Sequence, residues 1–353
     1  MSENLVVGLT ADFLVQGRLQ YRDIGLGILE NAGVQHRFLD RHEPVLSADL
    51  VQGLDALICL TPRITADTLS RSDQLAAVMR FGVGYDTVDV GACTEAGVAL
   101  FVTAGAASHS VAEAIIGWML ALGHHLVRKD RLTREGKWSE RLNWMGSEIG
   151  GKVVGIIGLG GIGGRLVELL RPFDAAEVLA LDPYASPERA VSLGVRCVAL
   201  DELLRSSDYV VVSCPLTEET RGLLGDAELG LMKPTAFLVN AARGGIVDEG
   251  ALVRALRAHA IAGAASDVFA LEPAGAEHPF YELDNIVLAP HSIAWTDEFF
   301  ERMGTMCCRQ AISLFGGVIP EGLVNKDVVG RPAFAKKLQG FRERGRRGEV
   351  LGA

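Results

Sequence analysis

One glycine-rich segment constrains the fold of this chain more than any other feature of its sequence. Gly158, Gly160 and Gly163 stand in G-x-G-x-x-G spacing between a short apolar run and a helical pattern over 162–170. The next apolar run ends in an acid, Asp182. In a strand–turn–helix context the three glycines permit a tight turn, close approach of a pyrophosphate and packing of the helix on the strand. The segment therefore predicts a Rossmann unit that binds a dinucleotide.

Short apolar runs alternate with helical patterns along most of the chain. This alternation predicts parallel βα units, and the continuously apolar character of most runs is typical of strands that are covered on both faces. The alternation restarts after residue 150, so the expected fold class is α/β with two domains of parallel-sheet βα units. The predicted strands cover 5–9, 34–39, 56–60, 76–80 and 98–102 in the first series, and 153–158, 177–182, 196–200, 209–214, 236–241, 263–269 and 286–290 in the second.

Two further helices and two polar segments complete this organisation. Ser110 and Glu113 have the spacing of a capping box and predict the start of a long helix, and another helical pattern covers 297–315. The polar region 128–150 contains two tryptophans and predicts a connecting arm. The tail from Lys326 is rich in Lys and Arg, and we expect it to be solvated and frayed.

Composition argues against several classes of protein. The formal net charge of −10 disfavours a nucleic-acid partner, which requires a basic surface. The six cysteines form no C-x-x-C pair and have no histidine at zinc-finger spacing, so we expect reduced core thiols and no metal site. No uninterrupted apolar stretch approaches the roughly 18 residues of a membrane span, and the N-terminus lacks the features of a signal peptide. We expect a soluble cytoplasmic protein without a membrane partner.

Three successive strands of the second series are followed by residues that can carry chemistry. Arg243 follows the first of them, Asp267 and Glu272 follow the run GAAS (263–266) of the next, and His291 follows the last. Ligands of parallel α/β sheets bind at the carboxyl ends of the strands, so we expect these side chains to converge on the dinucleotide. An arginine fork suits a carboxylate, a histidine donates protons near neutral pH, and a neighbouring carboxylate favours the imidazolium. Each residue alone has a structural explanation, but their coincidence favours a catalytic set.

Several long motifs occur in order along the chain. They read RFGVGYDTVD (80–89), SVAE (110–113), GLGGIG (158–163), PLTEETRGLLG (215–225), LMKPTAFLVNAARGGIVDEGAL (231–252), SDVFALEP (266–273) and APHSIAWTDE (289–298). Through them the chain resembles the D-isomer-specific 2-hydroxyacid dehydrogenase family from about residue 50 to 325. The resemblance implies a flavodoxin-like substrate domain built from both ends of the chain, with an inserted Rossmann NAD-binding domain. The expected boundaries are 1–104 and 294–325 for the substrate domain, 105–293 for the NAD-binding domain and 326–353 for a basic tail.

The resemblance also implies an activity and its residues. It suggests a homodimeric NAD-dependent enzyme that interconverts a 2-oxo acid and a D-2-hydroxy acid, with NAD favoured over NADP because Asp182 would repel a 2′-phosphate. The implied catalytic residues are Arg243, Glu272 and His291. The implied substrate-binding residues are Val83, Gly84, Arg243, His291 and Trp295, although Trp295 is equally compatible with the core. The implied cofactor-binding residues are Gly158, Gly160, Gly161, Ile162, Gly163, Asp182, Cys214, Pro215, Thr220, Ala241, Ala242, Arg243, Asp267 and His291.

Departures from the family pattern concern the substrate. The usual Asn-Thr-Pro reads Val-Thr-Ala at 102–104, and a common Asn is Ala107. The expected pocket loops contain few cations apart from Arg63, which disfavours 3-phosphoglycerate and favours an uncharged side chain, with glyoxylate or hydroxypyruvate as the small option. Phosphite dehydrogenases carry Lys where this chain has Val83, and formate dehydrogenases carry Gln at Pro290. These two relatives, and an NAD-sensing regulator like the C-terminal-binding-protein co-repressors, remain the alternative functions.

Overall fold

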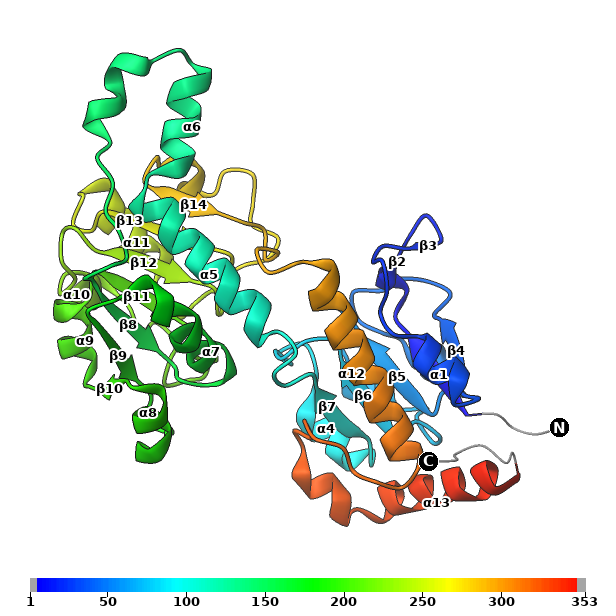
Figure 1. Cartoon of the computed structure of the whole chain (residues 1–353). Helices are drawn as coiled ribbons and strands as arrows, with labels where there is room; N and C mark the ends of the chain where they lie inside the picture. Colours follow the sequence, from blue (N-terminus) through cyan, green and yellow to red (C-terminus); the bar gives the residue numbers. More distant parts are fainter. Residues whose placement is uncertain (1–4, 348–353) are drawn as a thin grey trace. The chain divides into compact units, whose positions relative to one another are not determined.

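Two parallel sheets organise the chain, one in each of its two units (Figure 1). Unit 1 comprises Met1–Ala107 and Trp295–Ala353, and unit 2 comprises Ser108–Ala294. The computed structural model describes residues 5–347, with side chains described through residue 341. The expected α/β class, with parallel βα units in two domains, is confirmed.

The sheet of unit 2 contains seven parallel strands in the order β10-β9-β8-β11-β12-β13-β14. The first strand of the unit lies in the middle of this sheet, and the chain winds outward from it in both directions, as in a Rossmann fold. The order reverses between β8 and β11, where the carboxyl ends of the strands leave room for a ligand. The strands are β8 (Val153–Ile157), β9 (Glu177–Leu181), β10 (Arg196–Cys197), β11 (Tyr209–Val212), β12 (Phe237–Asn240), β13 (Gly263–Ser266) and β14 (Ile286–Leu288).

Helices cover both faces of this sheet. One buried cluster packs α5 and α7 against the strands, and a second packs α9, α10 and α11 against the opposite face. Burial on both faces explains why β11, β12 and β13 are buried at every position. The helices are α5 (Ser108–Gly123), α6 (Leu126–Arg134), α7 (Gly161–Leu170), α8 (Pro187–Leu193), α9 (Leu200–Ser206), α10 (Asp226–Leu229) and α11 (Glu249–Arg257), with 3₁₀ turns η2 (Trp138–Asn143), η3 (Arg171–Phe173) and η4 (Pro279–Glu282).

Two details of unit 2 differ from the sequence prediction. The predicted capping box at Ser110 is wrong, because α5 begins at Ser108 and Ser110 lies buried inside the helix. A carboxylate oxygen of Glu113 instead lies 3.3 Å from Nε2 of His109, one helical turn earlier. The strand predicted over 196–200 is only two residues long, because α9 begins at Leu200 with two acids in its first turn, where they stabilise the helix.

The expected connecting arm is helical for much of its length. After α5 the chain bends by 56° into α6, and α6 with η2 rises from the sheet of unit 2 as a hairpin, at the top of Figure 1. At the base of this hairpin the Arg128 guanidinium lies 4.5 Å from the ring centroid of Trp144. Arg128 also pairs with Asp284 at 3.4 Å, so the hairpin is fastened to the β13–β14 side of the unit.

The sheet of unit 1 contains five parallel strands in the order β4-β1-β5-β6-β7. This is the strand order of flavodoxin-like folds. A short antiparallel hairpin, β2 with β3, extends from the first strand. The strands are β1 (Val6–Leu9), β2 (Leu14–Val15), β3 (Arg18–Leu19), β4 (Gln35–Phe38), β5 (Ala56–Cys59), β6 (Ala77–Arg80) and β7 (Ala99–Val102).

Helices also cover the sheet of unit 1. A buried cluster packs α2, α3 and α4 against one face, while α12 packs against β6 and α1. The helical pattern predicted over 297–315 is confirmed as α12, whose first turn is capped by Thr296. The helices are α1 (Gly27–Asn31), α2 (Ala48–Val51), α3 (Ala66–Leu69), α4 (Val90–Glu95), α12 (Asp297–Phe315) and α13 (Pro332–Arg347), with 3₁₀ turns η1 (Ala11–Phe13) and η5 (Lys326–Gly330).

The segment from Lys326 is folded where the structure describes it, so the expectation of a frayed tail is wrong there. It forms η5 and then α13, which places two phenylalanines on one helical face. Phe334 and Phe341 are both buried, and Phe341 lies edge-to-face with Phe315 of α12. Burial lowers the pKa of Lys337 to about 8, and its ammonium donates to the Ala96 carbonyl at 2.7 Å. The abundance of Lys and Arg concealed this apolar face.

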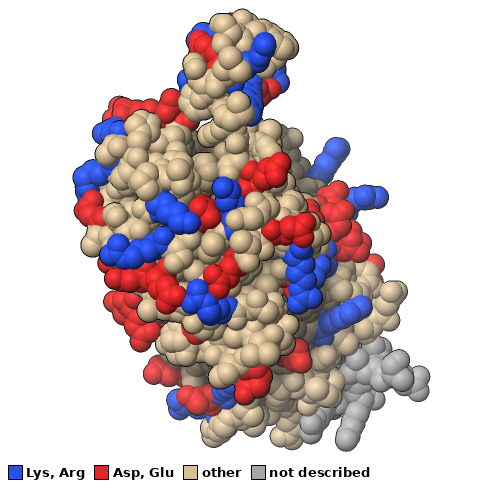
Figure 2. Space-filling view, turned by 60° about the vertical axis from the view of Figure 1, so that its left-hand side comes forward, with Lys and Arg blue, Asp and Glu red and all other residues tan. Residues whose placement is uncertain are grey.

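Cysteines and charged side chains follow simple patterns. All six cysteines are free thiols, four of them buried, whereas Cys197 is exposed and Cys214 half-buried. On the face drawn in Figure 2, Lys and Arg side chains alternate with Asp and Glu and form no continuous basic area among the residues shown there. Within residues 5–347, no single helix has the length and apolar composition needed to cross a membrane. The bent pair of α5 and α6 reaches that length and composition only when the two helices are taken together.

Candidate active site

The turn between β8 and α7 has the geometry that the glycine fingerprint predicts. Gly158 has φ +98°, and a Cβ there would lie 2.7 Å from the backbone nitrogen of Cys214. A Cβ on Gly163 would clash with the carbonyl of Gly158, so helix and strand pack closely. A Cβ on Gly160 would meet no atom within 4 Å. Open space at Gly160, beside the N-terminus of a ten-residue helix, fits a pyrophosphate.

Asp182 is held rigidly at the end of β9. Its two carboxylate oxygens accept hydrogen bonds from the backbone amides of Leu159, at 2.7 Å, and Tyr184, at 2.8 Å. The Arg189 guanidinium donates to the carbonyls of Leu159 and Gly160, both at 3.0 Å. The acid is thereby fixed against the glycine turn, where a ribose hydroxyl of a dinucleotide would reach it.

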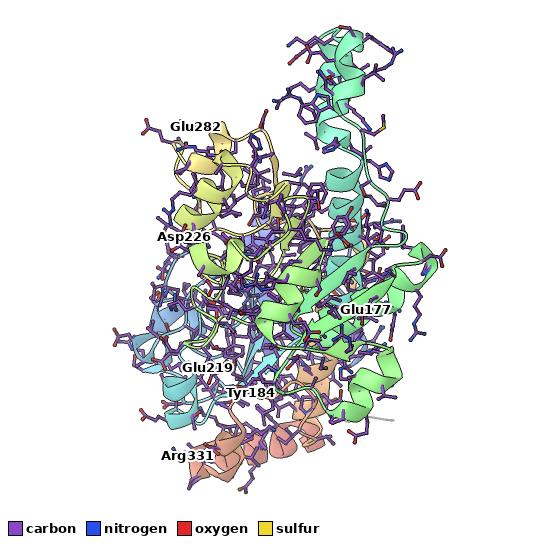
Figure 3. All side chains as sticks on the ribbon, turned by 90° about the vertical axis from the view of Figure 1, so that its left-hand side faces the viewer. Glu177, Tyr184, Glu219, Asp226, Glu282 and Arg331 are labelled. Atoms are coloured by element: carbon purple, nitrogen blue, oxygen red, sulfur yellow. The ribbon has the colours of Figure 1, made fainter. Side chains whose placement is uncertain are left out.

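The remaining cofactor-binding candidates border the same turn. Gly161 and Ile162 form the first turn of α7, and Cys214 follows β11 with its backbone against Gly158. The Thr220 hydroxyl donates to the Pro215 carbonyl at 2.7 Å and so closes the loop after β11. The ring of Tyr184 spans to this loop, since its hydroxyl lies 3.1 Å from a carboxylate oxygen of Glu219 (Figure 3).

The three strands that precede the catalytic candidates are neighbours in the sheet, as β12, β13 and β14. Their carboxyl ends therefore meet at one edge of unit 2, with Ala241, Ala242 and Arg243 directly after β12. Buried Asn240 stabilises that turn, because its side-chain amide donates to the Arg243 carbonyl at 3.2 Å and accepts from the Ala242 amide at 3.2 Å. One guanidinium nitrogen of Arg243 donates to the Ala242 carbonyl at 2.7 Å.

Glu272 and His291 are in direct contact. A carboxylate oxygen of Glu272 lies 2.6 Å from Nδ1 of His291, and the other oxygen accepts from the Phe269 amide at 2.9 Å. Both side chains are partly open, with 35% and 45% of their surfaces exposed. Within the described residues Nε2 of His291 makes no hydrogen bond. Glu272 thus holds one nitrogen of the imidazole and leaves the other without a hydrogen-bond partner among the described residues.

The electrostatics of Glu272 favour its charged form. Burial opposes ionisation of the carboxyl group most strongly. Hydrogen bonds from His291 and the Phe269 amide, together with the charges of His291 and Arg243, outweigh burial and lower the pKa of Glu272. A carboxylate that is ionised near neutral pH stabilises a protonated histidine beside it.

Asp267 holds the loop that carries His291 through hydrogen bonds to its backbone. The His291 amide donates to the Asp267 carbonyl at 2.8 Å, and the Asp267 carboxylate accepts from the amides of Ser292, at 2.8 Å, and Ile293, at 3.1 Å. These bonds hold His291 at φ +53°, a backbone conformation that residues other than glycine rarely adopt. Burial raises the pKa of Asp267, and the two amide hydrogen bonds counteract this effect.

The other substrate-binding candidates belong to unit 1. Val83 and Gly84 lie in the loop after β6, where the Val83 side chain is 43% exposed. Trp295, 54% exposed, lies edge-to-face on Phe300 of α12, with ring centroids 5.4 Å apart. Trp295 is therefore only partly covered within unit 1 and presents much of its ring to the surroundings.

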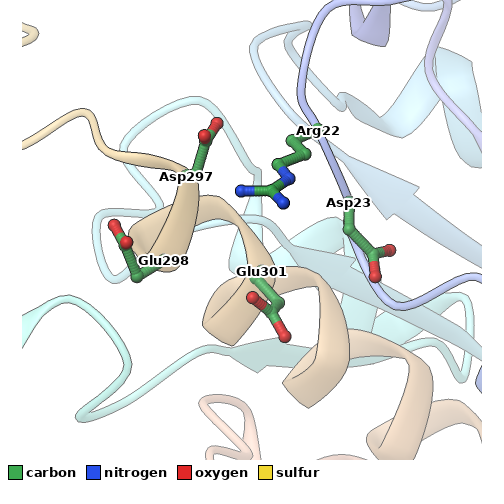
Figure 4. A pocket seen from close by; sticks show the side chains of 5 residues that line it. All are labelled: Arg22, Asp23, Asp297, Glu298 and Glu301. Atoms are coloured by element: carbon green, nitrogen blue, oxygen red, sulfur yellow. The ribbon is translucent and has the colours of Figure 1, made fainter.

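A cavity of about 290 Å³ elsewhere in unit 1 contains none of the predicted site residues. It is lined by Arg22 and Asp23 before α1 and by Asp297, Glu298 and Glu301 of α12. Figure 4 shows the Arg22 side chain extending between these carboxylates. Asp297 and Glu298 belong to the first turn of α12, where acids stabilise the helix dipole, so the cluster has a structural explanation.

Three residues that shape the site were not predicted as functional from the sequence. Asn240 orders the turn that carries Arg243, while Glu249 and His278 contact the loop that carries Glu272. Asn240 ends a buried strand just before Arg243, which is a signal that the sequence does contain. Glu249 and His278 are far apart in sequence, and only the fold brings them together.

Comparisons with known proteins agree with these features. Residues 116–292 match the family described as "D-isomer specific 2-hydroxyacid dehydrogenase, NAD binding domain", which confirms NAD as the predicted cofactor. A glyoxylate reductase of Aeropyrum pernix is 40% identical over 282 residues, covering 78% of this chain and 84% of that protein. A D-3-phosphoglycerate dehydrogenase of Archaeoglobus fulgidus is 36% identical over 318 residues, 90% of this chain, but the chain spans only 59% of its length. The TT0316 protein of Thermus thermophilus superposes with a TM-score of 0.79 at 29% identity, covering 91% of this chain and all of that one.

Proposed function

The chain belongs to the D-isomer specific 2-hydroxyacid dehydrogenases, and from this premise we propose that it interconverts a 2-oxo acid and a D-2-hydroxy acid with NAD. The observation that carries the proposal is the 2.6 Å contact between Glu272 and Nδ1 of His291, next to Arg243 at the edge of the NAD-binding sheet. Unit 2 is the NAD-binding domain of this proposal, and unit 1 is its substrate domain.

The proposed reaction is a balanced two-electron transfer. When bound, NAD supplies or accepts the hydride at the substrate carbon. In the reductive direction Nε2 of His291 gives its proton to the carbonyl oxygen, so that the 2-oxo acid becomes a 2-hydroxy acid while NADH becomes NAD⁺ and the histidine becomes neutral. Glu272 favours the imidazolium that donates this proton and fixes its orientation.

Arg243 is the proposed electrostatic partner of the substrate. Its planar guanidinium presents several donors that can bind the carboxylate and the ketone oxygen together, and it stabilises the negative charge that develops on that oxygen. The Asn240 amide, which orders the turn of Arg243, supports this role. Backbone amides at Val83 and Gly84 are the proposed further contacts for the substrate carboxylate.

The proposed substrate is a 2-oxo acid whose side chain carries no charge. This choice is supported by the uncharged side chains at 81–84 and by the 40% identity to a glyoxylate reductase. Glyoxylate and hydroxypyruvate are the small candidates. A phosphorylated substrate such as 3-phosphoglycerate is disfavoured, because a phosphate group needs cations to bind it and the expected pocket loops offer little besides Arg63.

A substrate panel tests the proposal. Purified protein would be assayed with NADH and with NADPH against glyoxylate, hydroxypyruvate, longer uncharged 2-oxo acids and a phosphorylated one. We expect turnover of a 2-oxo acid with an uncharged side chain. We also expect a higher kcat/KM for NADH than for NADPH, because the carboxylate of Asp182 would repel the 2′-phosphate of NADPH. The variant Asp182→Ala should narrow that gap. Equal use of both cofactors by the wild type would contradict the role given to Asp182.

The same panel separates the alternative functions. An NAD-sensing regulator would bind NADH, detected by fluorescence, without measurable turnover of any acid. A phosphite- or formate-type dehydrogenase would reduce NAD⁺ with those anions instead. Pro290 and Val83 stand where formate and phosphite dehydrogenases carry Gln and Lys, so the proposal expects neither anion to be oxidised.

We also propose that the protein is a cytoplasmic homodimer. The helical arm of unit 2 exposes five large apolar side chains, and at the top of Figure 2 uncharged surface lies among scattered charged side chains. Exposed apolar patches of this kind mark sites of association. Light scattering should give twice the chain mass of 37.7 kDa, and a monomeric mass would contradict the dimer. The exposed apolar residues are Leu126, Val127, Trp138, Leu142 and Met145.

The six free thiols are consistent with the proposed cytoplasmic location, because cysteines stay reduced in the cytoplasm.

A further inference from the structure

We propose that Glu249 and His278 form a positioning pair that fixes Glu272 against His291. This inference rests on the proposed function, because it assigns the pair a role in the proton transfer. Glu249 is the first residue of α11, and His278 directly precedes η4. Among the described residues, no hydrogen bond, ion pair or ring contact joins Glu249 or His278 to His291, so we expect an effect on catalysis to be transmitted through the loop that carries Glu272.

Backbone contacts define which nitrogen of His278 carries the proton. Nδ1 accepts a hydrogen bond from the Phe280 amide at 3.3 Å. The proton of the neutral ring therefore lies on Nε2, which is 3.3 Å from a carboxylate oxygen of Glu249. Nε2 then donates to that oxygen. Glu249 is consequently held in one orientation by His278.

The second oxygen of Glu249 reaches the catalytic loop. It accepts a hydrogen bond from the Ala270 amide at 2.7 Å. The preceding amide, that of Phe269, donates to Glu272 at 2.9 Å. Two consecutive backbone amides are thus bound by two different carboxylates, one supporting and one catalytic. The two amides belong to the peptide units on either side of Phe269, so movement of the backbone at Phe269 would disturb both hydrogen bonds together.

Aromatic packing makes this arrangement stiff. The His278 ring lies edge-to-face with Phe269, at 5.2 Å between centroids, and with Phe280, at 4.7 Å. The side chains of His278 and Glu249 are 14% and 24% exposed, compared with 45% and 35% for His291 and Glu272. The supporting pair is therefore better shielded from water than the pair that it supports.

The turn of Arg243 rests on the peptide between Phe269 and Ala270. A Cβ on Gly244 would clash with the carbonyl of Phe269, so the backbones of the two loops are in direct contact there. The peptide between Phe269 and Ala270 thus lies between Gly244 and the carboxylate of Glu249. Fixing this peptide fixes the distance between the loops that carry Arg243 and Glu272.

A double-mutant cycle tests whether Glu249 acts through Glu272. We expect Glu249→Ala to lower kcat about tenfold in the wild-type background, since coupled neighbours interact by up to a few kcal/mol. In the Glu272→Gln background the same change should cost less than about twofold. NADH affinity should stay unchanged in both. Equal losses in the two backgrounds would overturn the inference, because a merely structural residue costs the same in each.

Further variants separate positioning from folding. Glu249→Gln keeps one acceptor for the Ala270 amide but offers a donor to His278, so its loss should be smaller than that of Glu249→Ala. His278→Phe keeps the ring packing and removes both hydrogen bonds, and it should reproduce the loss of Glu249→Ala. The matched control is Glu282→Gln, which breaks the 2.8 Å pair between Arg257 and Glu282. That pair also joins α11 to η4, and its Glu282 lies at the periphery of unit 2 (Figure 3), so its loss should leave kcat unchanged.

Amide hydrogen exchange gives a readout that does not depend on turnover. Glu249→Ala should accelerate exchange at the amides of both Ala270 and Phe269, because the Phe269 amide belongs to the neighbouring peptide unit and is held there by Glu272. Acceleration at Ala270 alone would overturn the inference. If no 2-oxo acid is turned over by the wild type, the proposed function fails, while the exchange measurement still tests whether Glu249 fixes Glu272.

Discussion

The loops after β6 in unit 1 and after β12 in unit 2 make an informative comparison. Both follow a buried strand of four residues and both end in glycine, over 81–84 and 241–244. The first loop carries only uncharged side chains and offers backbone amides, whereas the second carries Arg243 and leads to the Glu272–His291 pair on the neighbouring strands. The difference suggests that unit 1 contributes to recognition while unit 2 carries the chemistry. Variants in the two units should therefore change different kinetic constants.

The largest expected effect is that of His291→Ala, which removes the proposed proton donor of unit 2. General acids typically contribute about 10²–10⁴-fold, so kcat for reduction should fall by about that range. Substrate and NADH affinities should change far less, which steady-state kinetics and fluorescence titration would show. A loss of less than about tenfold in kcat would indicate that another group donates the proton.

Arg243→Lys retains the charge but loses the planar pair of donors. We expect KM for the 2-oxo acid to rise by about 10–100-fold, as is reasonable for losing part of a charge-assisted hydrogen-bond pair. The dissociation constant of NADH, measured by fluorescence, should stay within about twofold. If NADH binding weakens as much as substrate binding, Arg243 supports the fold of the turn instead of contacting substrate.

Glu272→Gln should alter the pH dependence as well as the rate. Because the pKa of Glu272 is lowered, its charge is present near neutral pH and favours the protonated form of His291. Glutamine at this position removes the negative charge beside His291. Reduction, which needs the imidazolium, should then decline at lower pH than in the wild type, with about a tenfold loss at neutral pH that recovers on acidification. A profile of kcat against pH whose descending limb stays in place would separate Glu272 from His291.

The smallest effect is expected in unit 1, from Trp295→Ala. The ring is 54% exposed and rests on Phe300. As a wall of the substrate pocket it should change KM for the larger 2-oxo acids by a few-fold, leaving the pH profile of kcat intact. If the substitution lowers the melting temperature and leaves every KM unchanged, Trp295 is a core residue and the comparison of the two units loses this support.

Much of the fold follows from local sequence patterns. Apolar runs predicted the strands because both sheets are covered on two faces, and the glycine spacing predicted the turn before α7 because each glycine has its own steric reason. The helix α13 was not predicted, since Phe334 and Phe341 lie seven residues apart among many charges. Charge composition describes the exposed side of such a helix and says little about its buried side.

The candidate site also has a part that local sequence patterns predict and a part that they do not. Arg243, Asp267, Glu272 and His291 could be predicted because strand ends in a parallel sheet meet at one edge. Two hydrogen bonds could not be predicted, because they depend on loop conformations that no short motif specifies. In one the Asp267 carboxylate accepts from the Ser292 amide, and in the other the Glu249 carboxylate accepts from the Ala270 amide. Sequence patterns thus predict which side chains meet at the sheet edge more readily than which side chains hold them there.

The division of the chain between the two units has a consequence for protein synthesis. Unit 2 is continuous over Ser108–Ala294, whereas unit 1 needs α12 and the segment up to α13, which are synthesised after unit 2. The first part of unit 1 emerges before unit 2 but must wait until all of unit 2 has been translated, on the order of ten seconds or more at usual rates of elongation. Its sheet then still lacks α12 over β6, so apolar surface stays accessible to chaperones and to other nascent chains. Unit 2 begins later and can finish folding first.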